Sequence, residues 1–192
     1  MSLYRFTFFI LSFLSVFRLD AQHHSELNVR LKSDEAVLSV YQELTFKNTS
    51  EIPLKQIVLN DWNNAFSSKK SALARRFSDE FVRSFYYASE NELGKTTIYS
   101  LTDINGNPIE YSRVENQIDL VEIFLKEYLQ PGEKYSLKIH YEVQLPHEKF
   151  TRYGFDSNGK IEIRDWLLFP ARIENNEFLR YSNENINDAP NA

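Results

Sequence analysis

The sequence predicts a mainly β protein, either an antiparallel β-sandwich or a large, saddle-like curved sheet, with one inserted amphipathic helix. Apolar and polar residues alternate over several segments, and this places their side chains on opposite faces of a strand. The 15 Phe and 11 Tyr residues supply bulky side chains for a core between two sheets. One stretch, residues 67–87, instead has its apolar residues at helical spacing.

The clearest strand covers residues 133–145, EKYSLKIHYEVQL, in which apolar and polar residues alternate without a break. Pro131-Gly132 forms a turn before it, and Pro146 ends it because proline cannot donate to a ladder. Such a strand is about 40 Å long at about 3.3 Å per residue. It therefore requires long neighbouring strands, and the rest of the chain is expected to supply them.

The first neighbours are predicted at residues 26–32 and 35–48, joined by a turn at Ser33-Asp34 as an antiparallel hairpin. Gln42 is the single polar residue on the apolar face of the second strand. A third strand is expected at residues 54–59.

Residues 67–87 are predicted to form one helix. Its apolar residues recur every four positions, with charged residues of both signs between them: Leu73, Phe77, Phe81 and Phe85. A basic, aromatic stripe of this kind could contact nucleic acid or membrane. Because the charges alternate in sign, the sequence favours an amphipathic helix that lies on a sheet.

Later segments complete the sandwich. A hairpin is expected from residues 96–102 and 109–111, with Asn105-Gly106 in its turn. Residues 118–125 are apolar on both faces, so they predict an internal strand, and residues 161–169 predict a last strand ended by Pro170. From Glu174 onward the chain is polar and rich in Asn, which predicts a loop or tail.

The first 21 residues are predicted to be a signal peptide. Arg5 precedes an apolar run over residues 6–17, and Ala21 is a plausible cleavage position. The alternative is an uncleaved membrane anchor. A helix over residues 6–17 spans only about 18 Å, however, which is shorter than the hydrocarbon core of a membrane. We expect an exported chain with a β-domain over residues 22–173 and a polar tail over 174–192, where the domain would be truncated.

The charge and the absence of cysteine exclude several functions. A net charge of −5 disfavours binding to nucleic acid or to an anionic membrane. With no cysteine, the chain has no disulfide, no thiolate metal site and no Cys nucleophile. An exported domain of this kind must be held together by burial.

No catalytic, cofactor-binding or metal-binding residue is predicted. The four histidines, His23, His24, His140 and His147, include no i, i+4 pair of the kind that binds zinc. His140 is expected on the wet face of its strand and His147 in a loop, both at the surface. The carboxylates cluster as Asp79-Glu80, where Arg76 and Arg83 predict surface pairing, and as Glu174/Glu177. No Gly-x-Ser-x-Gly nucleophile motif occurs.

The order of several short motifs resembles the amino-terminal β-domain of the M1 zinc aminopeptidases, particularly the large exported bacterial members. The resemblance covers about residues 25–172. The matching residues fall in three groups: Asn48, Thr49 and Leu54; Leu129, Pro131, Gly132 and Glu133; Arg152, Gly154, Trp166 and Pro170.

The resemblance implies a saddle-shaped β-domain that packs on a zinc-binding catalytic domain and roofs its cleft. The sequence contains no HExxH motif of the family. It also contains no Gly-x-Met-x-Asn segment, since Met1 is the only methionine. The expectation is thus a non-catalytic domain of an exported metallopeptidase, periplasmic or extracellular. It would be inactive alone, and zinc and peptide substrates would bind in the catalytic domain.

Two alternatives belong to other classes. One is a stand-alone secreted β-sandwich used for binding or adhesion, and the other is a hydrolase whose site has no recognisable motif. A domain that packs on a larger body should expose an apolar patch where that body fits. Residues 118–125, apolar on both faces, are the expected place for it.

Overall fold

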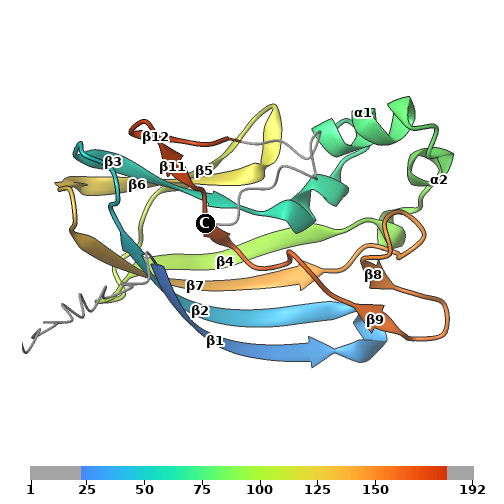
Figure 1. Cartoon of the computed structure of the whole chain (residues 1–192). Coiled ribbons are helices and arrows are strands. Elements are labelled where there is room, and N and C mark those ends of the chain that lie inside the picture. Colours follow the sequence, from blue (N-terminus) through green and yellow to red (C-terminus); the bar gives the residue numbers. More distant parts are fainter. Residues whose placement is uncertain (1–22, 181–192) are drawn as a thin grey trace, which may run out of the picture.

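The computed structural model describes residues 23–180, in which two four-stranded antiparallel sheets lie one over the other (Figure 1). The predicted mainly β, antiparallel class is confirmed. Sheet A consists of β1 (His23–Lys32), β2 (Val37–Lys47), β7 (Lys134–Gln144) and β4 (Lys95–Asp103), in that order. Sheet B consists of β10 (Phe169–Pro170), β3 (Leu54–Asn60), β6 (Gln117–Leu129) and β5 (Tyr111–Val114).

Strand β7 is internal in sheet A, as its strict alternation predicts. It pairs with β2 along its whole length, from Val37↔Gln144 to Lys47↔Lys134, and with β4 on its other side. β1 pairs with β2 from His23↔Phe46 to Lys32↔Val37, so the predicted first hairpin is confirmed. The turn between β1 and β2 is a 3₁₀ helix, Ser33–Glu35, followed by Ala36 at a φ of +52°.

The core lies between the two sheets. The inner residues of β2 and β7 are buried, and they face the inner residues of β3 and β6; fully buried examples are Val40, Leu44, Phe46, Leu137, Val143, Ile57, Leu59, Val121 and Ile123. Each such side chain stabilises the fold by about 1.5–3 kcal/mol relative to the exposed state. Gln42 interrupts this face but is fully hydrogen-bonded: it accepts from the Tyr141 hydroxyl at 2.9 Å and donates to the Leu168 carbonyl at 2.9 Å.

The prediction of a single helix over residues 67–87 is wrong. The segment contains two short helices, α1 (Ala72–Asp79) and α2 (Arg83–Tyr86), and a 3₁₀ helix precedes them at Trp62–Ser67. The break is at Phe81, whose φ is +61°, a left-handed conformation that no α-helix continues through. As a result Phe77 and Phe85 enter the core, while Phe81 is 80% exposed.

The strand predicted at residues 118–125 is present as β6, between β3 and β5. Its second face is partly covered by this chain, which corrects part of the sequence-based expectation, and Phe124 on that face is 36% exposed. Leu120 on that face is buried against Val58 and Ala171, and Arg180 makes an ion pair with Glu122. The cover is therefore this chain's own segment 171–180.

The hairpin predicted around Asn105-Gly106 forms only in part. The turn is present, with Gly106 at a φ of +87° and the Asp103 amide donating to the Asn107 carbonyl. Beyond an isolated Thr102↔Pro108 bridge, the chain leaves β4 and forms β5, which pairs with β6 in the other sheet. The segment thus crosses between the two layers.

The strand predicted at residues 161–169 is also wrong. Only its ends are extended, as β9 (Ile161–Glu162) and β10, with Asp165 between them at a φ of +49°. β9 pairs with β8 (Gly154–Phe155). The polar segment from Glu174 onward is predicted as loop or tail, but its first residues join Ile173 in a small hairpin of β11 (Ile173–Glu174) and β12 (Glu177–Phe178).

The predicted signal peptide, and the tail beyond residue 180, lie outside the described residues. Among residues 23–180, no helix has the length and apolar character needed to cross a membrane.

Candidate functional site

The histidines lie in different environments. His23 stacks on Phe46 on the inner side of β1, with ring centroids 4.8 Å apart, and burial lowers its pKa to about 4. His24 is exposed beside Glu26, and His147 packs on Phe155. Within residues 23–180, no three His, Asp or Glu side chains gather in a way that could hold a metal ion. These residues do not fit a zinc site.

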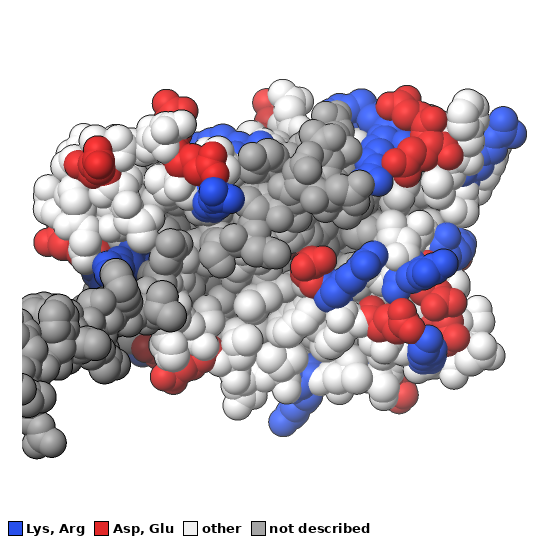
Figure 2. All heavy atoms as spheres, in the orientation of Figure 1, with Lys and Arg blue, Asp and Glu red and all other residues white. Residues whose placement is uncertain are grey.

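One carboxylate of each predicted cluster is paired with a cation at the surface. Glu80 accepts from Arg76 Nε at 2.7 Å one helical turn away, as the spacing predicts, and Glu174 makes an ion pair with Arg172. On the face drawn in Figure 2, acidic and basic side chains lie next to each other over the helical end of the molecule. This arrangement is typical of a solvated surface.

Residues that carry the family resemblance have structural roles. Asn48 is buried, and its side-chain amide donates to the carbonyls of Ile52 and Leu129, both at 2.9 Å. Pro170 pairs with Leu59 in β10. Asn48 thus fixes the loop after β2 to β6, and Pro170 fixes β10 to β3.

The most extensive buried polar cluster surrounds Asp61, between β3 and the 3₁₀ helix. One carboxylate oxygen accepts from Arg113 Nη2 at 2.7 Å, and the other accepts from the Thr96 hydroxyl at 2.7 Å. Asn64 donates from its amide to the Ile118 carbonyl at 2.7 Å. Because these partners come from both sheets, the cluster ties the layers together, and we assign it a structural role.

An uncovered apolar stripe lies on the edge strand β1. Leu27, Val29 and Leu31 stand opposite Gln42, Val40 and Leu38, so they belong to the inner face of sheet A. Their β2 partners are 0–3% exposed, whereas the three β1 side chains are 41–48% exposed. The cover over this face therefore ends at β2. Within the described residues, β1 pairs with no strand on its outer side (Figure 1).

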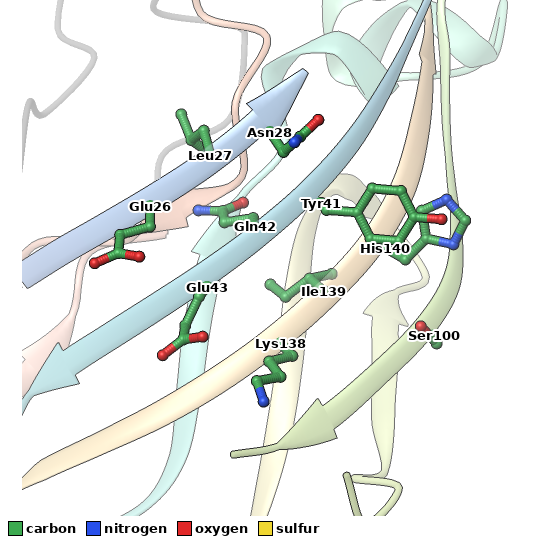
Figure 3. A pocket seen from close by; sticks show the side chains of 10 residues that line it. All are labelled: Glu26, Leu27, Asn28, Tyr41, Gln42, Glu43, Ser100, Lys138, Ile139 and His140. Carbon is green, nitrogen blue, oxygen red and sulfur yellow. The ribbon is translucent and has the colours of Figure 1, made fainter. Parts of the chain in front are cut away.

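The outer face of sheet A carries a groove of about 400 Å³ that crosses all four strands. Figure 3 shows the Tyr41 ring overlapping the ring of His140, which comes from the neighbouring strand. The two rings are stacked, with centroids 4.0 Å apart and planes 4° apart, and Tyr99 lies at 5.3 Å from His140. Residues from the four strands line the rest: Glu26, Leu27, Asn28, Gln42, Glu43, Ser100, Lys138 and Ile139.

Hydrogen bonds fix one end of this aromatic cluster. The Tyr99 hydroxyl donates to Glu142 at 2.7 Å, and Lys32 donates to the same carboxylate at 2.6 Å. The bond from Lys32 lowers the pKa of Glu142, and the bond to Glu142 raises the pKa of Tyr99. Glu142 is thus an anion at neutral pH that holds the Tyr99 ring beside His140.

Sequence reasoning correctly placed His140 on the wet face of its strand but found no role for it. Its neighbours Tyr41 and Tyr99 are 99 and 41 positions away in the chain and meet it only through strand pairing. Exposed aromatic residues on polar faces were the available signal, and register is needed to bring them together.

Comparison with known proteins gives structural neighbours only. No protein-family model and no curated protein sequence matches this chain. Among solved structures, the M1 zinc metallopeptidase from Deinococcus radiodurans is 17% identical, with a TM-score of 0.32 over 56% of this chain and 16% of that one. A mutant of it bound to a Tyr-Ser-Ala substrate is 20% identical, with a TM-score of 0.38 over 64% of this chain and 20% of that one.

The present chain thus spans about a fifth of the length of these solved metallopeptidases. It is similar in structure to part of them. At 17–20% identity, no activity and no residue role is transferred from them.

Proposed function

We propose that this chain is a non-catalytic β-domain of an exported M1-like zinc metallopeptidase, which packs on and roofs a zinc-binding catalytic domain. In this proposal the zinc, the peptide substrate and the catalytic groups all belong to that domain. The β-domain contributes a rigid scaffold and a docking surface. The order of the motifs from Asn48 to Pro170, described above, supports the same family.

The observation that carries the proposal is the apolar stripe of Leu27, Val29 and Leu31. It is unusual for a self-sufficient domain to leave three apolar side chains on the inner face of an edge strand each more than 40% exposed. An exposed edge strand also presents unpaired backbone groups that another strand or loop can satisfy. A catalytic domain seated there would cover both the side chains and the edge.

The experiment is an immunoprecipitation of the native protein from the exported fraction of producing cells, with an antibody against residues 23–180. The precipitate is assayed for zinc and for hydrolysis of aminoacyl-nitroanilides with and without a chelator. The expected result is chelator-sensitive hydrolysis and a co-purified polypeptide segment that carries HExxH. Recovery of this β-domain alone, without zinc or hydrolysis, contradicts the proposal.

A pair of variants on β1 tests the docking surface itself. Val29→Lys places a charge in the stripe and should greatly reduce the recovered hydrolysis, while Arg30→Glu, on the opposite face of the same strand, should not. Circular dichroism of both variants checks that the β-domain is folded. Equal hydrolysis from the two variants would locate the contact elsewhere.

The second candidate is a stand-alone secreted β-sandwich used for binding, and the aromatic groove on the outer face of sheet A favours it. Such a domain should be a soluble monomer that unfolds in one cooperative transition. A domain that needs a partner over β1 should instead self-associate through the stripe. Sedimentation of the purified chain, with Val29→Lys for comparison, distinguishes the two candidates.

A further inference from the structure

The groove on the outer face of sheet A lies on the side of the sheet opposite the core. Tyr41, Glu43 and their partners His140 and Lys138 alternate with the buried residues of the same strands. The stripe on β1 belongs to the other face. Leu27 lines both surfaces, but Tyr41, Glu43, His140 and Lys138 point away from the stripe, so the groove can be tested separately from the docking surface proposed above.

Tyr41 provides a flat aromatic platform in this groove. Its side chain is 58% exposed although its ring is stacked on His140, so one ring face remains open to solvent (Figure 3). The stack holds the ring in one orientation, which reduces the entropy that a ligand would otherwise have to remove. The negative face of a tyrosine ring attracts a cation placed over it.

The carboxylates beside the Tyr41 ring supply the negative charge that would attract such a cation. Glu26 and Glu43 are directly opposite each other on β1 and β2, and like charges in this arrangement are destabilising. Lys138 stands opposite Glu43 on β7, but its amine donates to the Ile104 carbonyl at 3.0 Å. Among the described residues, the Glu43 carboxylate has no hydrogen-bond or ion-pair partner. A bound cation would relieve the repulsion.

The spacing suits a planar cation. Glu43 follows Tyr41 by two residues on the same face, so their backbones are about 7 Å apart. A guanidinium can stack flat on an aromatic ring and present its N–H groups at its edge to a carboxylate in a bidentate pair. A compact ammonium would make one of these contacts at a time.

We propose that this groove binds an arginine side chain of a peptide or protein segment. The guanidinium stacks on Tyr41 and donates to Glu43, and Glu26 contributes a second negative charge. Asn28 and Ser100, at opposite ends of the groove, are available to the backbone of the segment. A neutral sugar could also stack on the ring, but it would bring no positive charge to Glu43 and Glu26.

The test is calorimetric titration of the full chain with acetyl-Gly-Arg-Gly-amide and with the same peptide carrying citrulline. Citrulline keeps the shape and removes the charge, so its affinity should be at least about tenfold lower, as expected for loss of a charge-assisted hydrogen bond. The lysine peptide should bind more weakly than the arginine peptide. Nuclear magnetic resonance locates the site, because the His140 ring resonances should shift on saturation.

Variants separate this groove from non-specific attraction. Tyr41→Ala and Glu43→Gln should each lower the affinity at least about fivefold. Tyr128→Ala and Glu127→Gln are matched controls in sheet B; Tyr128 is exposed to the same 58% as Tyr41, and both controls should bind normally. All four positions are at the surface, and thermal unfolding checks that each variant is folded.

Three results would overturn the proposal. They are equal affinity for the arginine and citrulline peptides, affinity unchanged by Tyr41→Ala, and saturable binding of a neutral oligosaccharide in place of the peptide. Absence of any saturable shift at His140 overturns it equally. None of these results bears on the stripe of β1, whose test measures hydrolysis and self-association.

Discussion

Gly154 begins β8 at a φ of +122°, and a Cβ atom there would lie 1.7 Å from the carbonyl oxygen of Pro146. The close approach permits a backbone hydrogen bond, because the next amide, that of Phe155, donates to the same carbonyl at 3.0 Å. On the other side, the Tyr153 hydroxyl donates to Asn63 at 2.8 Å in the buried layer. Glycine is thus required by backbone conformation and by space together.

Replacing Gly154 by Ala should lower the free energy of unfolding by about 3 kcal/mol or more, since the strain and the clash add. Gly159→Ala is the matched control: it also has a positive φ, +82°, but no atom lies within 4 Å of its Cβ position. Its cost should be about 1 kcal/mol. Urea unfolding measures both, and similar values for the two variants would contradict the close approach.

His23 makes stability depend on pH. Its pKa is lowered to about 4 in the folded state because the half-buried ring lies against Phe46. The unfolded chain takes up this proton near pH 6.5, so the free energy of unfolding falls as pH decreases from about 6.5 to about 4. With partial solvent screening we expect a loss of about 1 kcal/mol by pH 5.

The measurement is the difference in urea midpoint between pH 7 and pH 5, which should be smaller in His23→Phe than in the unsubstituted protein. His24→Gln, at the exposed neighbouring position, is the control. Glu92 does not interfere: its pKa is lowered to about 2 by the hydrogen bond from Lys149, so its contribution is lost only below about pH 4.5. An identical pH dependence in His23→Phe would show that another group is responsible.

At the scale of elements, the two short helices show how backbone conformation overrides apolar spacing. Phe77 and Phe85 pack against each other with ring centroids 5.2 Å apart, and both are buried. Phe81 lies halfway between them in the sequence. Its left-handed conformation ends α1 and redirects the chain, so that α2 can present Phe85 to the same cluster.

Substitution at these positions distinguishes two helices from one. Phe85→Ala should cost about 3–5 kcal/mol, because it empties a site in the core. Phe81→Gly should change stability by less than about 1 kcal/mol, since it removes an exposed ring and relieves a positive φ. Thermal unfolding measures both, and a large loss in Phe81→Gly would indicate a continuous helix.

At the scale of the whole molecule, the Asp61 cluster joins the two sheets. Thr96 comes from β4 in sheet A and Arg113 from β5 in sheet B, and both bind the same carboxylate. The Asp61 side chain in the ion pair is fully buried, whereas that of Arg113 is 25% exposed. A buried charge that loses its partner is far more costly than a surface one.

Arg113→Met should therefore lower the free energy of unfolding by about 3–5 kcal/mol. Lys32→Met is the matched control, because it breaks the more exposed pair with Glu142 and should cost much less than Arg113→Met. Chemical unfolding measures both. Equal losses would mean that the Asp61 cluster does not tie the layers together.

A feature could be predicted from the sequence where it depends on neighbouring residues. It could not be predicted where it depends on residues far away in the chain. Alternation is a local property of one strand, so β7, β2 and the wet side of His140 were predictable. The helix break at Phe81 and the crossover from β4 to β5 were not, because each depends on what the segment packs against. The expected cover for β6 came from residues 171–180, whose polar composition gives no sign of it.

Alternation with a period of two is a local property of each strand, so the sequence alone was enough to predict a mainly β protein whose long strands have one buried and one solvated face. Which faces are covered and which are exposed depends on tertiary packing. Strand register brings Tyr41 over His140 and leaves Leu27, Val29 and Leu31 beyond the cover of sheet B. Register is fixed by the free energy of the whole core, to which segments about a hundred residues apart contribute together.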